Sequence, residues 1–177
     1  MTQCFRRFVG ALVLDAAAFE DIEADRRSAV QSAIVVMAVC AAGGLAAAGL
    51  GIAGAASFVS GAVMALGGWL VWVGVIAVLG TTALPEPQTR SDVRELLRVL
   101  GYAAAPGVFI GLAALRSAAP FVIIVVALWM IAAAVVGLRQ ALDYRSTGRA
   151  IAVCVAGCLI SLGVMAAVAA MFTQTVS

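Results

Sequence analysis

Charged residues are absent from four long blocks of this sequence, and no other feature restricts the fold as strongly. A helix needs roughly 17–25 residues to cross the hydrocarbon core of a bilayer. Each block is long enough for one crossing, and the first is long enough for two. The blocks cover residues 28–85, 99–115, 117–138 and 150–177. The sequence therefore predicts five membrane spans.

These spans are expected to be helices. In lipid, backbone amides find hydrogen-bond partners only inside a helix or a closed barrel, and these apolar runs lack the alternation of barrel strands. The composition agrees, because 64% of the 177 residues are hydrophobic and 11% are charged. We predict an all-α, polytopic membrane protein with a bundle of five transmembrane helices. The spans cover about residues 32–54, 58–80, 99–115, 120–138 and 150–172, within a membrane domain of residues 28–177.

Residues 1–27 are predicted to form an amphipathic segment at the membrane interface. A helix over residues 4–14 would carry an apolar stripe at the i, i+3, i+4, i+7 spacing, with Arg6 and Arg7 off that stripe. The stripe consists of Phe5, Phe8, Val9 and Leu12. Such a helix is expected to lie along the headgroups.

Aspartates mark the starts of the next helices. Asp15 is predicted to cap a second short helix, and Asp25 to cap the helix that becomes the first span. The acidic residues between them are interpreted as a solvated face. They are Glu20, Asp21 and Glu23.

Two connections separate the first three spans. A turn is expected at residues 54–57, and a loop at residues 81–91, where Pro85 and Pro87 exclude helix. Asp92 and Glu95 then have the spacing of a capping box, which predicts a new helix that leads into the third span.

The third span is short and interrupted by Pro106. Its 17 uncharged residues would reach only about 25 Å as an α-helix. It could re-enter the membrane on the same side instead of crossing. Arg98 and Arg116, at its two ends, could extend to the interfaces and supply the missing length.

The arginine distribution distinguishes these topologies, because cytoplasmic loops hold the excess of basic residues. Five spans with a cytoplasmic N-terminus place ten arginines inside and only Arg116 outside. A re-entrant third span would give eight inside and three outside. We therefore predict five crossings and an external C-terminus. The ten arginines are Arg6, Arg7, Arg26, Arg27, Arg90, Arg94, Arg98, Arg139, Arg145 and Arg149.

Catalytic chemistry has few candidate groups. The chain has no histidine, and none of its nine acidic residues falls inside a predicted span. A proton relay or carboxylate ion site within the membrane would need such residues. Cys154 and Cys158 share a helix face, but two thiols supply only half of a tetrahedral metal site. We expect no catalytic activity, no cofactor and no metal, and interpret these cysteines as core residues.

Three tryptophans lie near the middles of spans instead of at the interfaces where tryptophan is enriched. They are Trp69, Trp72 and Trp129. One hypothesis is that they line a pocket beside the interrupted third span at Pro106. The alternative is that they are bulky packing residues. A polar cavity open to one leaflet and lined by these side chains would favour the first reading, and a dry, close-packed bundle the second.

Small residues recur at helical spacing on the first three spans, which predicts close helix contacts. On the third span Gly107 and Gly111 form a GxxxG motif. We expect these contacts within one chain before any contact between two. The stripes on the first two spans are Gly43, Ala47, Gly51 and Gly54, then Ser57, Gly61, Ala65 and Gly68.

Cys4, in the N-terminal segment, could be acylated or simply buried at the acyl boundary.

Three stretches carry a recognisable pattern. They are Leu14-Asp15 through Phe19-Glu20 to Asp25, then Glu95-Leu96-Leu97-Arg98-Val99-Leu100-Gly101-Tyr102-Ala103-Ala104-Ala105-Pro106, then Trp129 with Val136-Gly137-Leu138-Arg139-Gln140-Ala141-Leu142-Asp143 and Thr147-Gly148-Arg149-Ala150. Together they resemble the YIP family, multi-spanning membrane proteins named for interaction with Ypt/Rab GTPases, in its bacterial form. The resemblance implies five membrane helices and a cytoplasmic N-terminus. It marks Tyr102, Pro106, Trp129, Arg139, Asp143 and Arg149 as motif positions.

The sequence thus favours a YIP-like protein of the bacterial inner membrane that acts as a scaffold or membrane organiser. The alternative is a small lipid-handling or transport protein with a pocket near the third span. Expected partners are the bilayer, anionic lipids bound by cytoplasmic arginines, and a membrane-protein partner or a second copy of the chain. No nucleic-acid partner is expected. Rab binding is not expected, because the segment before the first span is short.

Overall fold

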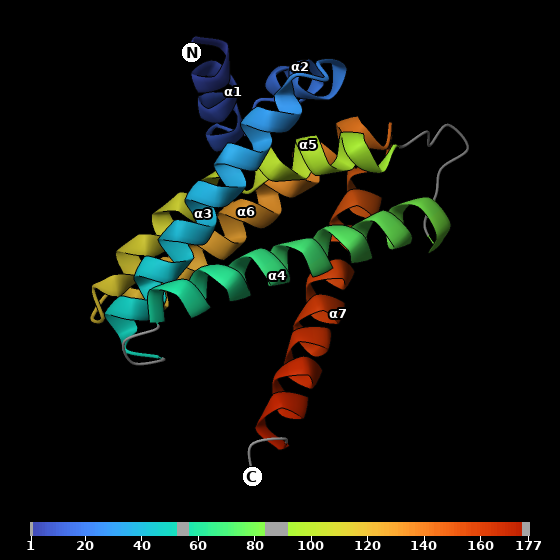
Figure 1. The fold of residues 1–177 in the computed structure, drawn as a ribbon. Helices are drawn as coiled ribbons and strands as arrows, with labels where there is room; N and C mark the ends of the chain where they lie inside the picture. Colours follow the sequence, from blue (N-terminus) through green and yellow to red (C-terminus); the bar gives the residue numbers. More distant parts are fainter. Residues whose placement is uncertain (1, 53–56, 84–91, 175–177) are drawn as a thin grey trace.

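The computed structural model describes residues 2–52, 57–83 and 92–174, and these fold into helices without a strand. Figure 1 shows their arrangement. The predicted all-α polytopic membrane fold is confirmed. The elements are α1 (Thr2–Leu12), α2 (Ala16–Ala24), α3 (Ser28–Leu50), α4 (Ser57–Val78), the π-helix η2 (Leu79–Ala83), α5 (Val93–Ala103), the 3₁₀ helix η3 (Ala105–Ala114), α6 (Ala119–Ala141) and α7 (Thr147–Gln174).

Asp15 accepts a hydrogen bond from the Ala17 amide and caps α2 as predicted. The predicted Asp25 cap of the first span was wrong, because α3 begins at Ser28 with Arg27 in the cap position and no side-chain cap, although Asp25 accepts a hydrogen bond from the Arg27 amide. Asp92 and Glu95 form the predicted capping box at the start of α5. Of the expected turn at 54–57 only Ser57 is described, and it begins α4. Pro85 and Pro87 lie outside the described residues, whereas residues 81–83 of the predicted loop belong to the π-helix η2, so the loop begins later than predicted.

The first span ends earlier than predicted. Helix α3 ends at Leu50 because Gly51 adopts a left-handed conformation with φ 72°. The amide of Ile52 then bonds back to the Ala47 carbonyl at 3.2 Å. This is a Schellman end, which glycine allows without steric cost. The predicted boundary at Gly54 was therefore wrong.

Among the described residues, four helices are long and apolar enough to cross a membrane, and the bent pair α5–η3 makes a fifth candidate. The pair bends by 43°, at the point where Pro106 begins the 3₁₀ turn. Proline is tolerated there because the first amides of a helix need no internal partner. The break at Pro106 thus starts a new helix and does not end the segment.

Contacts with α3 favour a full crossing by this pair. Near the start of α3, Ser32 lies against Gly101, and near its end the Arg116 Nε atom donates to the Gly49 carbonyl at 2.9 Å. The bent pair therefore accompanies α3 along its length. A 3₁₀ helix rises about 2.0 Å per residue against 1.5 Å for an α-helix. The ten residues of η3 thus gain about 5 Å, which supplies length that the sequence estimate lacked.

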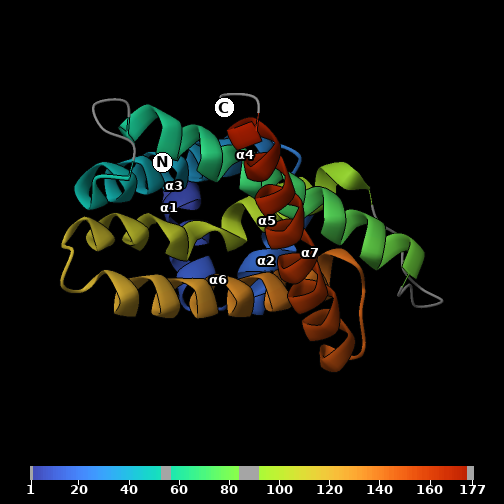
Figure 2. The ribbon, with the colours of Figure 1, turned by 90° about the horizontal axis from the view of Figure 1, so that it is seen from below.

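The bent pair lies between α3 and α6 (Figure 2). Helix α4 packs along α3, and α7 contacts α4 and α6 before its C-terminal end extends beyond the other helices (Figure 1). Glycines permit the closest approaches. A Cβ atom on Gly61 would lie 3.2 Å from the Cα atom of Gly44, so α3 and α4 touch through their backbones.

The two glycines of the GxxxG motif are packed differently. A Cβ atom on Gly107 would lie 2.7 Å from Val39 and 3.1 Å from the Met130 sulfur, wedged between α3 and α6. A Cβ atom on Gly111 would lie 3.4 Å from Leu45, which is an ordinary contact. The tight position of the motif is therefore Gly107.

We predict that Gly107→Ala lowers the free energy of unfolding by about 1–3 kcal/mol, because the added methyl group overpacks this contact. Gly111→Ala is the matched control and should change it by less than about 0.5 kcal/mol. Equilibrium unfolding in mixed SDS micelles measures both values. Equal effects of the two substitutions would contradict the packing described here.

Candidate functional site

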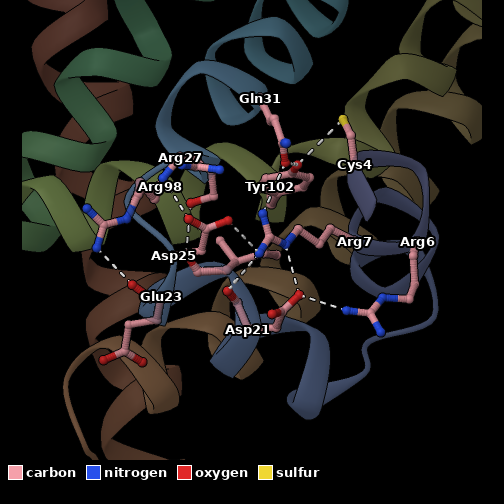
Figure 3. Close-up of polar contacts among 12 residues, drawn as sticks. Cys4, Arg6, Arg7, Asp21, Glu23, Asp25, Arg27, Gln31, Arg98 and Tyr102 are labelled. Atoms are coloured by element: carbon pink, nitrogen blue, oxygen red, sulfur yellow. Dashed lines mark hydrogen bonds and ion pairs between the residues drawn. The ribbon is translucent and has the colours of Figure 1, made fainter. Parts of the chain in front are cut away.

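The most unusual side chain of the structure is Arg7, which is completely buried. Its guanidinium group binds the carboxylates of Asp21 and Asp25, each at 2.9 Å. It also donates to the Asp21 carbonyl at 3.1 Å and to the Gln31 side-chain oxygen at 3.1 Å. Figure 3 shows this network, which joins α1, α2 and the start of α3.

The network is neutral as a whole. Arg6, whose side chain is 71% exposed, adds a second positive charge at 3.0 Å from Asp21. Two arginines thus face two aspartates. Hydrogen bonds from Arg7 lower the pKa of Asp21. The pKa of Asp25 is lowered first by the Arg27 amide and then by Arg7. Both carboxylates are therefore held ionised as partners of the buried guanidinium.

One interpretation of the N-terminal sequence was wrong. Asp21 is a binding partner of the buried Arg7 instead of part of a solvated face, although Glu20 is exposed as expected. The pairing did leave a signal in the sequence. In an antiparallel hairpin, positions equidistant from the turn face each other. Gly10 of α1 faces Ala18 of α2. Three residues further from the turn on each helix, Arg7 faces Asp21.

Tyr102 connects this network to α5. Its hydroxyl group donates to the Gln31 side-chain oxygen at 2.9 Å and lies 3.6 Å from the Cys4 sulfur (Figure 3). The ring is completely buried. Gln31 therefore accepts from both Arg7 and Tyr102. The motif tyrosine attaches α1 to α5 through these contacts.

Trp129 fixes the other end of α1. Its indole N–H donates to the Leu12 carbonyl at 2.8 Å, and its ring stacks on Phe109 with centroids 5.6 Å apart. Trp129 lies near the middle of α6, so the end of α1 reaches well along the bundle. Leu14, at the turn, adopts a left-handed conformation with φ 62°. Trp129 is thus an anchor for the hairpin.

A cavity of about 610 Å³ opens between α3, α4 and α5. A second cavity of about 300 Å³ adjoins it and shares Val36 and Trp69 with it. Trp72 lines the second cavity, whose wall is almost entirely apolar. The predicted tryptophan pocket is therefore present for two of the three tryptophans. Neither Trp129 nor Pro106 lines these cavities, although Gly107 does.

Arg98 lies in the wall of the larger cavity and is only 7% exposed. One terminal nitrogen donates to the Glu23 carbonyl at 2.8 Å (Figure 3), and the Glu95 carboxylate lies 3.9 Å away. Its buried Nε atom has no hydrogen-bond partner within the described part of the chain. Arg98 therefore points toward the end of α2 and is largely buried there.

The remaining motif positions lie at the turn between α6 and α7, away from these cavities. Arg139 and Asp143 are exposed, and Arg149 is half-buried. Asp143 adopts φ 52° at this turn. Tyr144 beside it is buried and donates to the Gly80 carbonyl at 2.8 Å, which ties the turn to the end of α4 and η2. Among the described residues no three candidate ligands gather as a metal site.

We predict that Arg7→Ala lowers the free energy of unfolding by about 3 kcal/mol, because it leaves two carboxylates without their partner. Arg6→Ala is the control and should cost at most about 1 kcal/mol, since that pair is exposed. Maleimide labelling of Cys4, with the other three cysteines replaced by alanine, should accelerate in Arg7→Ala alone. Unchanged labelling would show that the ion pairs do not hold α1.

The hairpin should also respond to acid. The pKa values of Asp21 and Asp25 are lowered from 3.8, so their contribution is present above pH 3.8 and is lost as the pH falls through the lower, folded-state values. Burial raises the pKa of Glu23, so protonation of Glu23 favours the folded state and does not release the hairpin. Fluorescence of Trp129, with Trp69→Phe and Trp72→Phe, should stay constant from neutral pH to 3.8 and change below it. A transition above pH 3.8 would contradict this assignment.

Comparison with known proteins adds one finding. Residues 9–168 match the family model described as the Yip1 domain. Neither the curated proteins nor the solved structures give a match. The matched region contains Tyr102, Arg98 and both aspartates that bind Arg7.

Proposed function

Because the chain belongs to the Yip1 domain family, we propose that this multi-pass membrane protein is a non-catalytic membrane organiser that acts through its α1–α2 hairpin. The hairpin would insert into one leaflet as a rigid wedge fixed to the bundle. Its rigidity is supported by the buried Arg7 network at one end of α1 and the Trp129 hydrogen bond at the other.

The observation that carries this proposal is an apolar ridge on the outside of α1 and the turn that follows it. Phe5 is 69% exposed, Val9 37% and Val13 68%. In water each exposed apolar Å² would cost about 25 cal/mol. The ridge ends where α1 meets the middle of α6, at a depth where lipid chains surround the bundle. Lipid would therefore solvate the ridge, and the hairpin would displace lipid volume in one leaflet.

The proposed orientation places the hairpin in the cytoplasmic leaflet of a bacterial inner membrane, with an external C-terminus. Ten of the eleven arginines fall on one side in this arrangement, as cytoplasmic loops require. The course of α5–η3 beside α3 supports it, because Arg116 then lies at the opposite end of α3 from Arg7. The non-catalytic assignment rests on the lack of histidine and of acidic residues in the spans.

Reconstitution in phosphatidylethanolamine and phosphatidylglycerol vesicles tests the wedge. We predict that the wild-type chain, at high protein-to-lipid ratio, narrows or tubulates vesicles in cryo-electron micrographs, because it expands one leaflet. Phe5→Ser with Val13→Ser should abolish this effect, since the polar ridge would leave the acyl region. Phe121→Ser is the matched control, because Phe121 is 72% exposed on α6 outside the hairpin.

The proposal fails if wild-type protein and protein-free vesicles look alike, or if Phe121→Ser abolishes the effect equally.

The depth of α1 in the membrane is measured separately. A spin label at Val9→Cys, with the native cysteines replaced, should be relaxed more strongly by oxygen in the membrane than by a soluble nickel chelate. The reverse would place α1 in water.

A further inference from the structure

The cavity beside Arg98 has the features of a lipid site, and it lies apart from the apolar ridge of α1. We propose that it binds one anionic phospholipid, with the phosphate at Arg98 and an acyl chain in the groove between α3 and α4. This inference goes beyond the wedge and does not depend on it.

The headgroup end is defined by an unsatisfied donor. Arg98 is more than nine-tenths buried, and its Nε–H has no acceptor among the described residues. A buried donor of this kind costs free energy unless an acceptor fills the position. Planar guanidinium groups pair well with phosphate oxygens. The Glu95 carboxylate lies 3.9 Å from the terminal Nη2 atom of Arg98, which is too distant for a hydrogen bond.

The charges around the mouth of the cavity favour an anion. Arg26, Arg94 and Arg98 line it together with Asp92 and Glu95. Both carboxylates already serve the start of α5, since Asp92 accepts from the Arg94 amide at 3.1 Å and Glu95 accepts from the Asp92 amide at 3.4 Å. The three guanidinium groups thus outnumber two carboxylates that are engaged with backbone.

The part of the site proposed for the acyl chain is apolar and long. From the mouth at Ala29 the cavities continue past Val36 and Trp69 to Gly43, along α3. A third cavity of about 470 Å³ shares Gly43 and Ala65 with the second and extends to Leu50. The distance from Ala29 to Gly43 is about 21 Å at the helical rise, which is longer than one leaflet of a core about 30 Å thick. An acyl chain fits this length, whereas a free phosphate would leave the groove unfilled.

Trp69 lies between the two ends and supports the same occupant. Its indole N–H is buried without a partner in the described structure, and its side chain lines both the larger and the second cavity. The ester carbonyls of a phospholipid lie between phosphate and acyl chain. They would supply the acceptor that this indole lacks.

Thermal unfolding of the detergent-solubilised, delipidated full chain tests the site. Dioleoyl-phosphatidylglycerol should raise Tm in a saturable manner, whereas dioleoyl-phosphatidylcholine and inorganic phosphate at equal concentration should not. Arg98→Met should weaken the apparent affinity at least tenfold. Arg139→Met is the matched control, because Arg139 is exposed at the α6–α7 turn outside the cavity, and it should behave as wild type.

A second variant separates lipid binding from folding, because Arg98→Met also removes the contact with Glu23. Ala33 is exposed in the cavity wall, so Ala33→Phe should block the groove with Arg98 in place and abolish the shift. Three results would overturn the proposal: an equal shift with phosphatidylcholine, a shift with phosphate alone, or wild-type affinity in both variants. Vesicle deformation should persist in Ala33→Phe, so the two proposals fail separately.

Discussion

The neutralisation of the Arg7 charge by Asp21 and Asp25 decides how the first part of the chain is built. A guanidinium group buried without partners would cost several kcal/mol, and removing either carboxylate would leave the buried Arg7 charge with only one of its two anionic partners. The two contacts fix the register of α2 against α1. Gln31 and Tyr102 extend the same network to α3 and α5. The segment before the first crossing is therefore an integral part of the bundle.

The bent pair α5–η3 is the centre around which the other helices are arranged. It lies between α3 and α6, and its conversion to a 3₁₀ helix at Pro106 gives a short apolar segment the length to accompany α3. Gly107 allows this close approach on both sides. The α-helical first half carries the two polar groups that matter most, Arg98 and Tyr102.

Arg98 links the two proposed activities in space. One of its terminal nitrogens binds the Glu23 carbonyl at the end of α2, and the same side chain lines the cavity on the side of α3 and α4. The hairpin thus contributes to holding Arg98 in position. Lipid in the cavity and the wedge in the leaflet would meet at this one guanidinium group.

The helical class, the number of candidate crossings, the caps at Asp15 and Asp92 and the interruption at Pro106 were all predictable from the amino-acid sequence. These features depend on local composition and on the need of each backbone amide in lipid for a hydrogen-bond partner. Family membership was also readable from the sequence. Three outcomes required the packed structure: Arg7 points inward, Trp129 bonds the Leu12 carbonyl instead of lining the cavities, and the Arg98 Nε atom has no acceptor among the described residues. Those outcomes depend on which helices become neighbours, and a polar side chain in a membrane protein takes its partner from whichever helix lies beside it.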